Sequence, residues 1–169
     1  MFGAVSPYKG IEEVIKFWNQ HQPAYQLVIV GRPDSSQYGA SLRSIAGTNE
    51  NITFRLEFVT SEELQQWLSL ADCCLYNYRQ ILTSGSIHPP RALGIPVLLP
   101  ERLTSIELGE PNSRVLRFSC MDSLESQLKR ALELDVDYHS ARPWREEHDW
   151  ASIAEKTMDI YRHVTQTSQ

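Results

Sequence analysis

The sequence predicts an α/β domain built on a doubly wound parallel sheet of about six strands, with helices on both faces. Short apolar runs alternate along the chain with segments of helical period, and no internal repeat is visible. Several runs are continuously apolar, which is typical of parallel strands that are buried on both faces. Strand and helix signals take turns over most of the chain, as βαβ units require.

The predicted strands are the apolar runs, and they lie at 2–5, 26–31, 52–59, 72–76, 96–99 and 114–118. Ligands of a doubly wound sheet bind beyond the carboxyl ends of its strands. The segments that follow these runs are therefore where a site is expected.

Helices are predicted between the strands, from apolar residues at helical spacing, at 10–20, 61–71 and 122–134. Ser61 stands before two acidic residues, an order that predicts a serine cap for the second of these helices. Pro89 and Pro90 fit the first turn of a further helix, which ends at Gly94.

The C-terminal stretch departs from the strand–helix pattern. Residues 139–144 predict a loop or a short helix broken at Pro143, and residues 146–164 predict a long closing helix. The apolar face of the closing helix carries Trp150, Ile153, Ala154, Met158 and Tyr161. We expect a closing helix of this length to pack against something outside the core sheet.

Composition places the chain among ordinary globular proteins, with 41% hydrophobic and 22% charged residues. Its 169 residues suit one domain at 1–169, or one compact lobe of a larger protein. The net charge of −5, with 16 basic residues scattered among 21 acidic ones, argues against a nucleic-acid-binding face. No apolar run reaches the roughly 20 residues of a membrane helix.

The three cysteines, Cys73, Cys74 and Cys120, lack metal-ligand spacing and form an odd number. They predict reduced thiols and a cytoplasmic location. The chain begins almost directly on a predicted strand, as a lobe excised from a larger protein would, although a natural short protein would fit as well.

The first candidate site is the turn Pro7-Tyr8-Lys9-Gly10, between the predicted strand at 2–5 and an amphipathic helix. A lysine and a bare backbone at the start of a helix are the groups that bind anions. The alternative interpretation is a solvated surface lysine in a turn.

The second candidate is the segment 78–87, which follows the predicted strand at 72–76. Small residues there enter a helix, so their amides and hydroxyls can form an anion-binding nest. The alternative is that Ser84 or Ser86 only caps the helix. Because both turns follow strands of one parallel sheet, a paired phosphate site is more plausible than either turn alone.

Other polar residues give weaker signals. His88 has no Cys or His at metal-ligand spacing, and a capping or solvent-facing role is favoured over a catalytic one. Glu107 and Glu110 lie in a long irregular region, where a solvated acidic face is the simpler interpretation. The sequence contains no pattern of a Ser-His-Asp triad, a Walker loop, a zinc site or a Gly-x-Gly-x-x-Gly turn. No metal site is predicted.

The order of segments resembles the C-terminal, donor-binding lobe of group 1 (family 4) retaining glycosyltransferases, whose GT-B architecture has two Rossmann-like lobes. The segments that carry the likeness span nearly the whole chain. They are 2–10, 27–31, 58–64, 70–72, 92–97 and 150–154, together with Tyr161. The resemblance implies a single Rossmann-like donor-binding domain excised from a two-domain GT-B protein.

The resemblance assigns the donor diphosphate to Gly3, Lys9, Ser84, Gly85, Ser86 and Ile87. The family usually places an arginine where this chain has Ala4, and two glutamates where it has Ile81 and Pro89. The catalytic residues are therefore unknown. A branch of the family carries a turn of the Thr-Ser-Gly-Ser type in the region of the glutamates, and this sequence is similar to that branch.

The resemblance also implies further contacts with the donor. Arg32, Arg79 and Thr83 are candidates for phosphate or sugar contacts, and Arg55 and Leu56 are placed at the nucleobase. The donor would be a UDP- or GDP-linked sugar. It is a substrate, so no cofactor and no metal are implied for this lobe.

The resemblance implies transfer of a sugar, hexosyltransferase-like, from a nucleoside-diphosphate donor to a glycan, lipid or other acceptor in polysaccharide or glycoconjugate synthesis. The partner lobe would be a missing N-terminal acceptor-binding domain, and the isolated lobe would be inactive. The full-length protein would be cytoplasmic, with a peripheral place at the inner face of the membrane as one option. The alternatives are a non-catalytic binding module on the same fold and a GT-B nucleotide-sugar epimerase.

Overall fold

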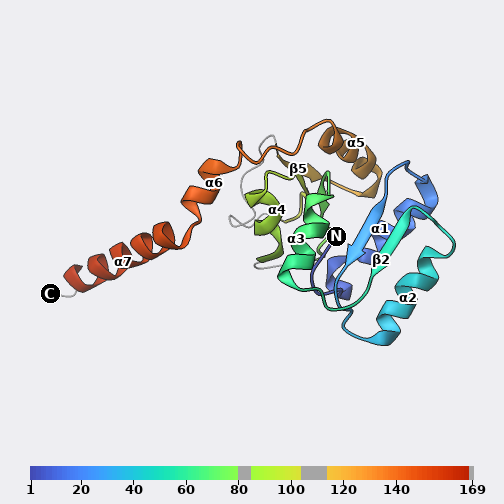
Figure 1. Cartoon of the computed structure of the whole chain (residues 1–169), viewed down its shortest axis with the longest axis horizontal. Coiled ribbons are helices and arrows are strands. Elements are labelled where there is room, and N and C mark those ends of the chain that lie inside the picture. The colour runs from blue at the N-terminus through green and yellow to red at the C-terminus, as the bar shows by residue number, and fades with distance from the viewer. Residues whose placement is uncertain (80–84, 104–113, 168–169) are drawn as a thin grey trace.

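A computed structural model of the chain describes residues 1–79, 85–103 and 114–167. These residues form an α/β body, from which a long C-terminal helix extends (Figure 1). The described strands pair in parallel and helices cover both of their faces, so the predicted fold class is confirmed.

The described strands form two parallel groups. β1 (Leu27–Val30) pairs with β2 (Ile52–Arg55). The second group has the order β3-β4-β5, with strands at Cys74–Leu75, Val97–Pro100 and Val115–Phe118. All these pairings are parallel, so the carboxyl ends of the strands in each group lie at one edge.

The segment predicted as the first strand pairs only through isolated bridges, from Phe2 to Val30 and from Val5 to Pro33. Gly3 lies between them with a φ of 90°, which is not an extended conformation, so a continuous ladder cannot form. The Phe2 ring also contacts the Tyr76 ring, with centroids 6.1 Å apart. The segment thus contacts both groups of strands. It occupies the place of the first predicted strand without forming a regular strand.

Two apolar clusters show that the strands are buried on both sides. Leu98 belongs to the first cluster, whereas its neighbours Val97 and Leu99 belong to the second. Successive strand residues point to opposite faces, so this division marks the two faces of the sheet. The first cluster lies against α1 (Ile11–His21), α2 (Ser36–Ala46) and α5 (Met121–Leu132). The second includes Leu68 of α3 (Ser61–Ser69) and Ile87, which precedes α4 (His88–Ala92).

The N-cap of helix α3 lies one residue earlier than predicted. Thr60, not Ser61, is the N-cap, because its hydroxyl accepts from the Glu63 amide over 3.2 Å while the Glu63 carboxylate accepts from the Thr60 amide over 2.9 Å. The sequence also gave no prediction of α2. That helix buries only Gly39, Leu42 and Ala46, so its apolar stripe is too sparse to stand out.

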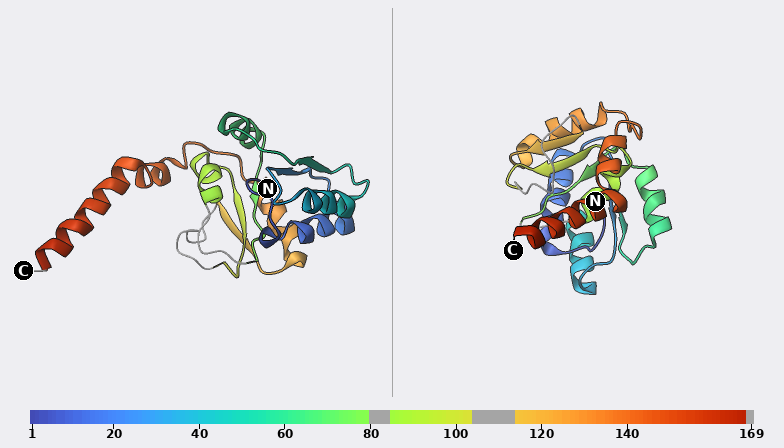
Figure 2. Two further views of the ribbon diagram at one scale, coloured as in Figure 1. Left: turned by 90° about the horizontal axis from the view of Figure 1, so that it is seen from below. Right: turned by 90° about the vertical axis from the view of Figure 1, so that its left-hand side faces the viewer.

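The C-terminal region contains two helices. Pro143 lies in the first turn of α6 (Arg142–Glu147), so it begins this short helix rather than breaking one. Helix α7 (Trp150–Thr167) starts four residues later than predicted, because the Asp149 carboxylate accepts from the Ser152 amide over 2.7 Å and caps it. Figure 2 shows α7 leaving the body, and its Trp150 is 85% exposed.

Candidate functional site

The turn after the first segment brings Lys9 to the carboxyl edge of the sheet. Pro7–Lys9 form one turn of 3-10 helix, which ends where the Gly10 amide donates to the Pro7 carbonyl over 3.1 Å. Gly10 takes a left-handed conformation with a φ of 59° and is the N-cap of α1. Proline at the start and glycine at the end suit this turn, because each already favours the backbone angle required.

Lys9 is not a solvated surface lysine, because it is only 5% exposed. Its Nζ donates to the Phe2 carbonyl over 3.1 Å and lies 5.6 Å from the centre of the Tyr78 ring. Burial lowers the pKa of Lys9 to about 8, since the charged form loses hydration, and the nearby Asp34 carboxylate opposes this shift. A partly desolvated ammonium of this kind gains strongly from an anion that reaches it.

Because Gly3 has no side chain, Lys9 of the first turn and Ser86 of the second can both lie close to it. A Cβ at Gly3 would lie 3.0 Å from Nζ of Lys9 and 4.0 Å from Cβ of Ser86. A Cβ at Gly31 would overlap the Gly3 carbonyl oxygen. Three of the residues predicted at the diphosphate, Gly3, Lys9 and Ser86, therefore converge.

Two buried tyrosines hold Ser86, and the sequence pattern assigns a role to neither of them, although Tyr78 begins the second candidate segment. The Tyr76 hydroxyl donates to the Ser86 carbonyl over 2.5 Å, and the Tyr78 hydroxyl shares a 2.6 Å hydrogen bond with Oγ of Ser86. Tyr76 is 2% exposed and Tyr78 is fully buried. A tyrosine at alternate positions after a strand is an ordinary core pattern, so only the hydroxyl partners mark these two.

The rest of the second turn is placed differently from Ser86. Gly85–Ile87 form a 3-10 turn, in which Gly85 is exposed and Ile87 is fully buried in the second apolar cluster. The N-cap of α4 is Ile87, with no side-chain cap, so Ser86 does not cap that helix. The predicted residues Thr83 and Ser84, and the family glutamate position at Ile81, lie outside the described residues.

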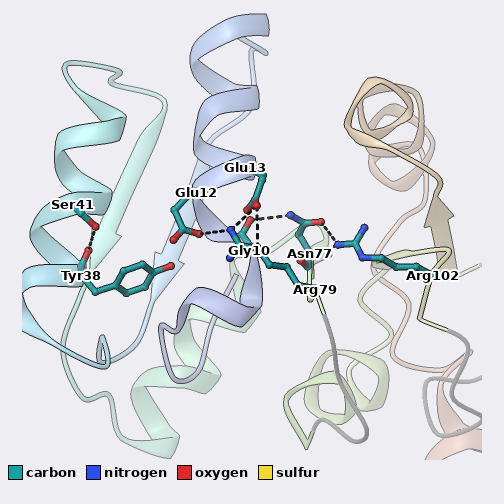
Figure 3. Close-up of polar contacts among 8 residues, drawn as sticks. All are labelled: Gly10, Glu12, Glu13, Tyr38, Ser41, Asn77, Arg79 and Arg102. Atoms are coloured by element: carbon teal, nitrogen blue, oxygen red, sulfur yellow. Dashed lines mark hydrogen bonds and ion pairs between the residues drawn. The ribbon is translucent and has the colours of Figure 1, made fainter.

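A polar network joins the Lys9 turn to the segments that follow β3 and β4 (Figure 3). Nδ2 of Asn77 donates to the Gly10 carbonyl over 2.9 Å, and Oδ1 of Asn77 accepts from Arg102 over 3.0 Å. The same Arg102 nitrogen donates to the Tyr78 carbonyl over 3.0 Å. The Arg79 amide donates to the Tyr8 carbonyl over 2.7 Å. These hydrogen bonds hold together the three segments that follow residues 2–5, β3 and β4.

The arginines proposed for the phosphate lie in other settings. The Arg79 guanidinium donates to the Glu13 carboxylate over 2.6 Å and lies 3.6 Å from Glu12, so it neutralises the acidic first turn of α1. Arg32 is exposed just after β1, and its carbonyl accepts from the Val5 amide over 2.8 Å. Ala4, at the usual arginine position, is exposed.

The positions predicted at the nucleobase lie at the end of β2. Arg55 forms ion pairs with Glu57 and Glu63, and its side chain is 42% exposed. Leu56 is half-buried and packs against the first apolar cluster. Arg55 pairs in register with Val30, the last residue of β1. Both predicted positions therefore lie at the carboxyl edge of this pair of strands.

Pro89 stands at the second family glutamate position, in the first turn of α4, and brings no carboxylate there. His88 is the first residue of this helix, and its ring stacks at 5.6 Å on Trp144 of α6. It therefore packs between elements rather than capping one.

Neither a metal-binding cluster nor a membrane-spanning helix is found in the part of the chain that the structure describes. Within residues 1–79, 85–103 and 114–167, no group of three or more His, Cys, Asp or Glu side chains is arranged to hold a metal ion. None of the helices in that part of the chain combines the length and apolarity needed to cross a membrane.

Comparison with known proteins gives a consistent picture. No protein-family model matches the sequence. A GDP-mannose:glycolipid 4-beta-D-mannosyltransferase from Xanthomonas campestris pv. campestris is 29% identical over 110 residues, which are 64% of this chain and 32% of that relative. The chain thus spans about a third of the length of the curated relatives it matches.

Solved structures match over almost the whole chain. HepE from Anabaena, solved in complex with UDP, has a TM-score of 0.72 and 15% identity, over 96% of this chain and 47% of that one. Sucrose-phosphate synthase from Thermosynechococcus elongatus has a TM-score of 0.73 and 20% identity, over 97% of this chain and 45% of that one. At such identities the likeness shows the fold, and it is that of one lobe of GT-B glycosyltransferases. The predicted resemblance to one lobe of GT-B glycosyltransferases is confirmed.

Proposed function

We propose that this chain is the donor-binding lobe of a nucleotide-sugar glycosyltransferase and that it holds the donor diphosphate between Lys9 and the turn at Ser86. The observation that carries the proposal is the convergence of Lys9, Gly3 and Ser86 at the carboxyl edge of the sheet. A curated relative named for GDP-mannose and a structural neighbour solved with UDP support a nucleotide-linked donor.

In this function the buried ammonium of Lys9 has an electrostatic task. When the bond between sugar and phosphate breaks, negative charge grows on the diphosphate leaving group. A cation already held in a water-poor site stabilises that charge without having to reorganise. Arg79 would contribute only indirectly, because its guanidinium is paired with Glu13.

A titration of the chain with GDP, UDP and GDP-mannose by isothermal calorimetry tests the proposal. Binding of a nucleoside diphosphate is expected, with affinity at least about tenfold lower in Lys9→Ala, since a charge-assisted contact to phosphate is lost. Lys16→Ala is the matched control, because Lys16 is exposed on α1. Unchanged binding in Lys9→Ala would refute the diphosphate assignment.

The stereochemistry and the products are also open to direct test. The resemblance predicts retention of configuration, while the curated relatives are named for a beta linkage. The anomeric configuration of the product relative to the donor, measured by NMR in an enzyme supplied with an acceptor lobe, decides between retention and inversion. The isolated chain is expected to bind donor but to transfer sugar negligibly, because a closed cleft needs both lobes.

The same assay separates the alternatives. An epimerised nucleotide sugar with no transfer product would favour an epimerase. No nucleotide binding at all, in the isolated chain or with an acceptor lobe, would favour a non-catalytic module, for which Ala4 and Pro89 are the supporting residues.

A further inference from the structure

We propose that Tyr76 and Tyr78 are positioning residues of the donor site, which hold Ser86 at a set place beside Lys9. This inference rests on the proposed function, since it names the groups that shape the same site. Neither tyrosine is given a role by the sequence pattern.

The contacts of Ser86 are made at two separate atoms. The Tyr76 hydroxyl donates to the Ser86 carbonyl over 2.5 Å, which sets the backbone. The Tyr78 hydroxyl meets Oγ of Ser86 at 2.6 Å, which sets the side-chain rotamer. Two hydrogen bonds from two side chains restrict both the position and the orientation of this one residue.

The tyrosines are themselves rigid supports. Both belong to the second apolar cluster, and their rings contact each other with centroids 5.5 Å apart. Tyr76 directly follows β3, and its amide donates to the Leu98 carbonyl of β4 over 3.0 Å. Burial raises the pKa of Tyr76 well above its ordinary value, so its hydroxyl keeps the proton that it donates in the hydrogen bond.

Tyr78 also connects Ser86 to the other half of the site. Its ring centre lies 5.6 Å from Nζ of Lys9 and 5.7 Å from the ring centre of Tyr8, in the neighbouring turn. The electron-rich face of a tyrosine ring attracts an ammonium at such a distance. One side chain thus contacts Lys9 with its ring and Ser86 with its hydroxyl, which sets the spacing between the two groups.

Positioning of this kind is tested by a double-mutant cycle on GDP binding, with Tyr78→Phe, Ser86→Ala and the double variant. Tyr78→Phe removes only the hydroxyl and keeps the ring beside Lys9. We expect each single variant to bind GDP about three- to tenfold more weakly, as for a lost hydrogen bond. The double variant should be no weaker than Ser86→Ala alone, because Tyr78 acts through Ser86. A merely structural effect of Tyr78 would instead add to that of Ser86.

Tyr25→Phe is the matched control, since Tyr25 precedes β1 at the opposite, amino edge of the sheet and its variant should bind GDP as the wild type does. Tyr76→Phe should weaken GDP binding in the wild-type chain. It should weaken GDP binding in Ser86→Ala as well, because the Tyr76 hydroxyl donates to the backbone carbonyl of residue 86, which the alanine keeps. Thermal unfolding of each variant shows whether it is folded.

The outcomes of the two proposals are distinguishable. Wild-type affinity in Tyr78→Phe, together with weak binding in Lys9→Ala, overturns the positioning role and leaves the proposed function standing. Absence of GDP and UDP binding in the wild-type chain, both alone and with an acceptor lobe, overturns both. If Tyr78→Phe does not fold, Ser86→Ala tests the same bond from its other end, and wild-type affinity in that variant overturns the inference.

Discussion

The side-chain amide of Asn77 donates a 2.9 Å hydrogen bond to the carbonyl of Gly10, across 67 positions of sequence. Asn77 is only 3% exposed, so this bond forms away from water. Its other amide atom, Oδ1, accepts from Arg102. One buried side chain thereby joins the end of the Lys9 turn to the segments that follow β3 and β4.

Gly10→Ala tests how closely these segments are packed. A Cβ at Gly10 would lie 2.5 Å from Nδ2 and from the carbonyl oxygen of Asn77, and the left-handed φ of 59° adds strain for any L-residue. We expect a loss of at least about 2 kcal/mol of unfolding free energy in urea titrations. Gly47→Ala gives an upper bound for strain without contact, because Gly47 has open space around it and its φ of 61° with ψ of −127° is less accessible to an L-residue than the left-handed conformation of Gly10. A loss of only about 1 kcal/mol in Gly10→Ala, as the left-handed conformation alone would cost, would mean that contact with Asn77 does not set the effect.

Asn77→Ala tests the network itself. The change leaves the Gly10 carbonyl without its donor and removes one acceptor of Arg102, so a loss of about 1–3 kcal/mol in unfolding free energy is expected. Binding of GDP should weaken as well, because the Lys9 turn loses its anchor. Asn51→Ala, which removes an amide bonded to the Pro23 carbonyl on the other side of the fold, should destabilise the chain without this effect on GDP binding.

The pKa of Lys9 predicts a pH dependence of stability. Its pKa falls from 10.5 to about 8 on folding, so between these two values the unfolded chain holds a proton that the folded chain has released. Stability relative to a Lys9→Met variant should therefore rise with pH through this window, and the cost of burying the charge is fully present below about pH 8. From pH 7.5 to 9.5 we expect a relative gain of about 2 kcal/mol in urea unfolding. Parallel pH profiles of the two proteins would contradict the burial of a charged Lys9.

Removal of α7 tests whether the body depends on this helix. The side chains described for α7 are exposed, apart from the half-buried Ser152, so truncation after residue 149 should change the unfolding free energy by less than about 1 kcal/mol. The affinity for GDP should stay the same. A large loss of stability would show that α7 packs on the body in solution, in contrast to its extended placement in Figure 1.

The fold class and most of the elements are predictable from the amino-acid sequence. Continuously apolar runs such as Leu27–Val30 and Val97–Pro100 identify buried parallel strands, because burial on both faces removes the polar alternation. Local capping and apolar period located α1, α3 and α5 to within a few residues. The site was predicted at two turns, because anion binding by a lysine and a glycine-rich backbone has a local signature.

The construction of those turns depends on contacts between segments that are distant in sequence. Lys9 could have been a surface lysine, and its burial comes from Phe2 and Tyr78, which the fold brings around it. Arg79 was a candidate phosphate ligand, but the start of α1 places Glu13 against it. The hydroxyls that hold Ser86 come from ordinary core tyrosines. Burial and hydrogen-bond partners are properties of residues distant in sequence, so no local pattern could have revealed them.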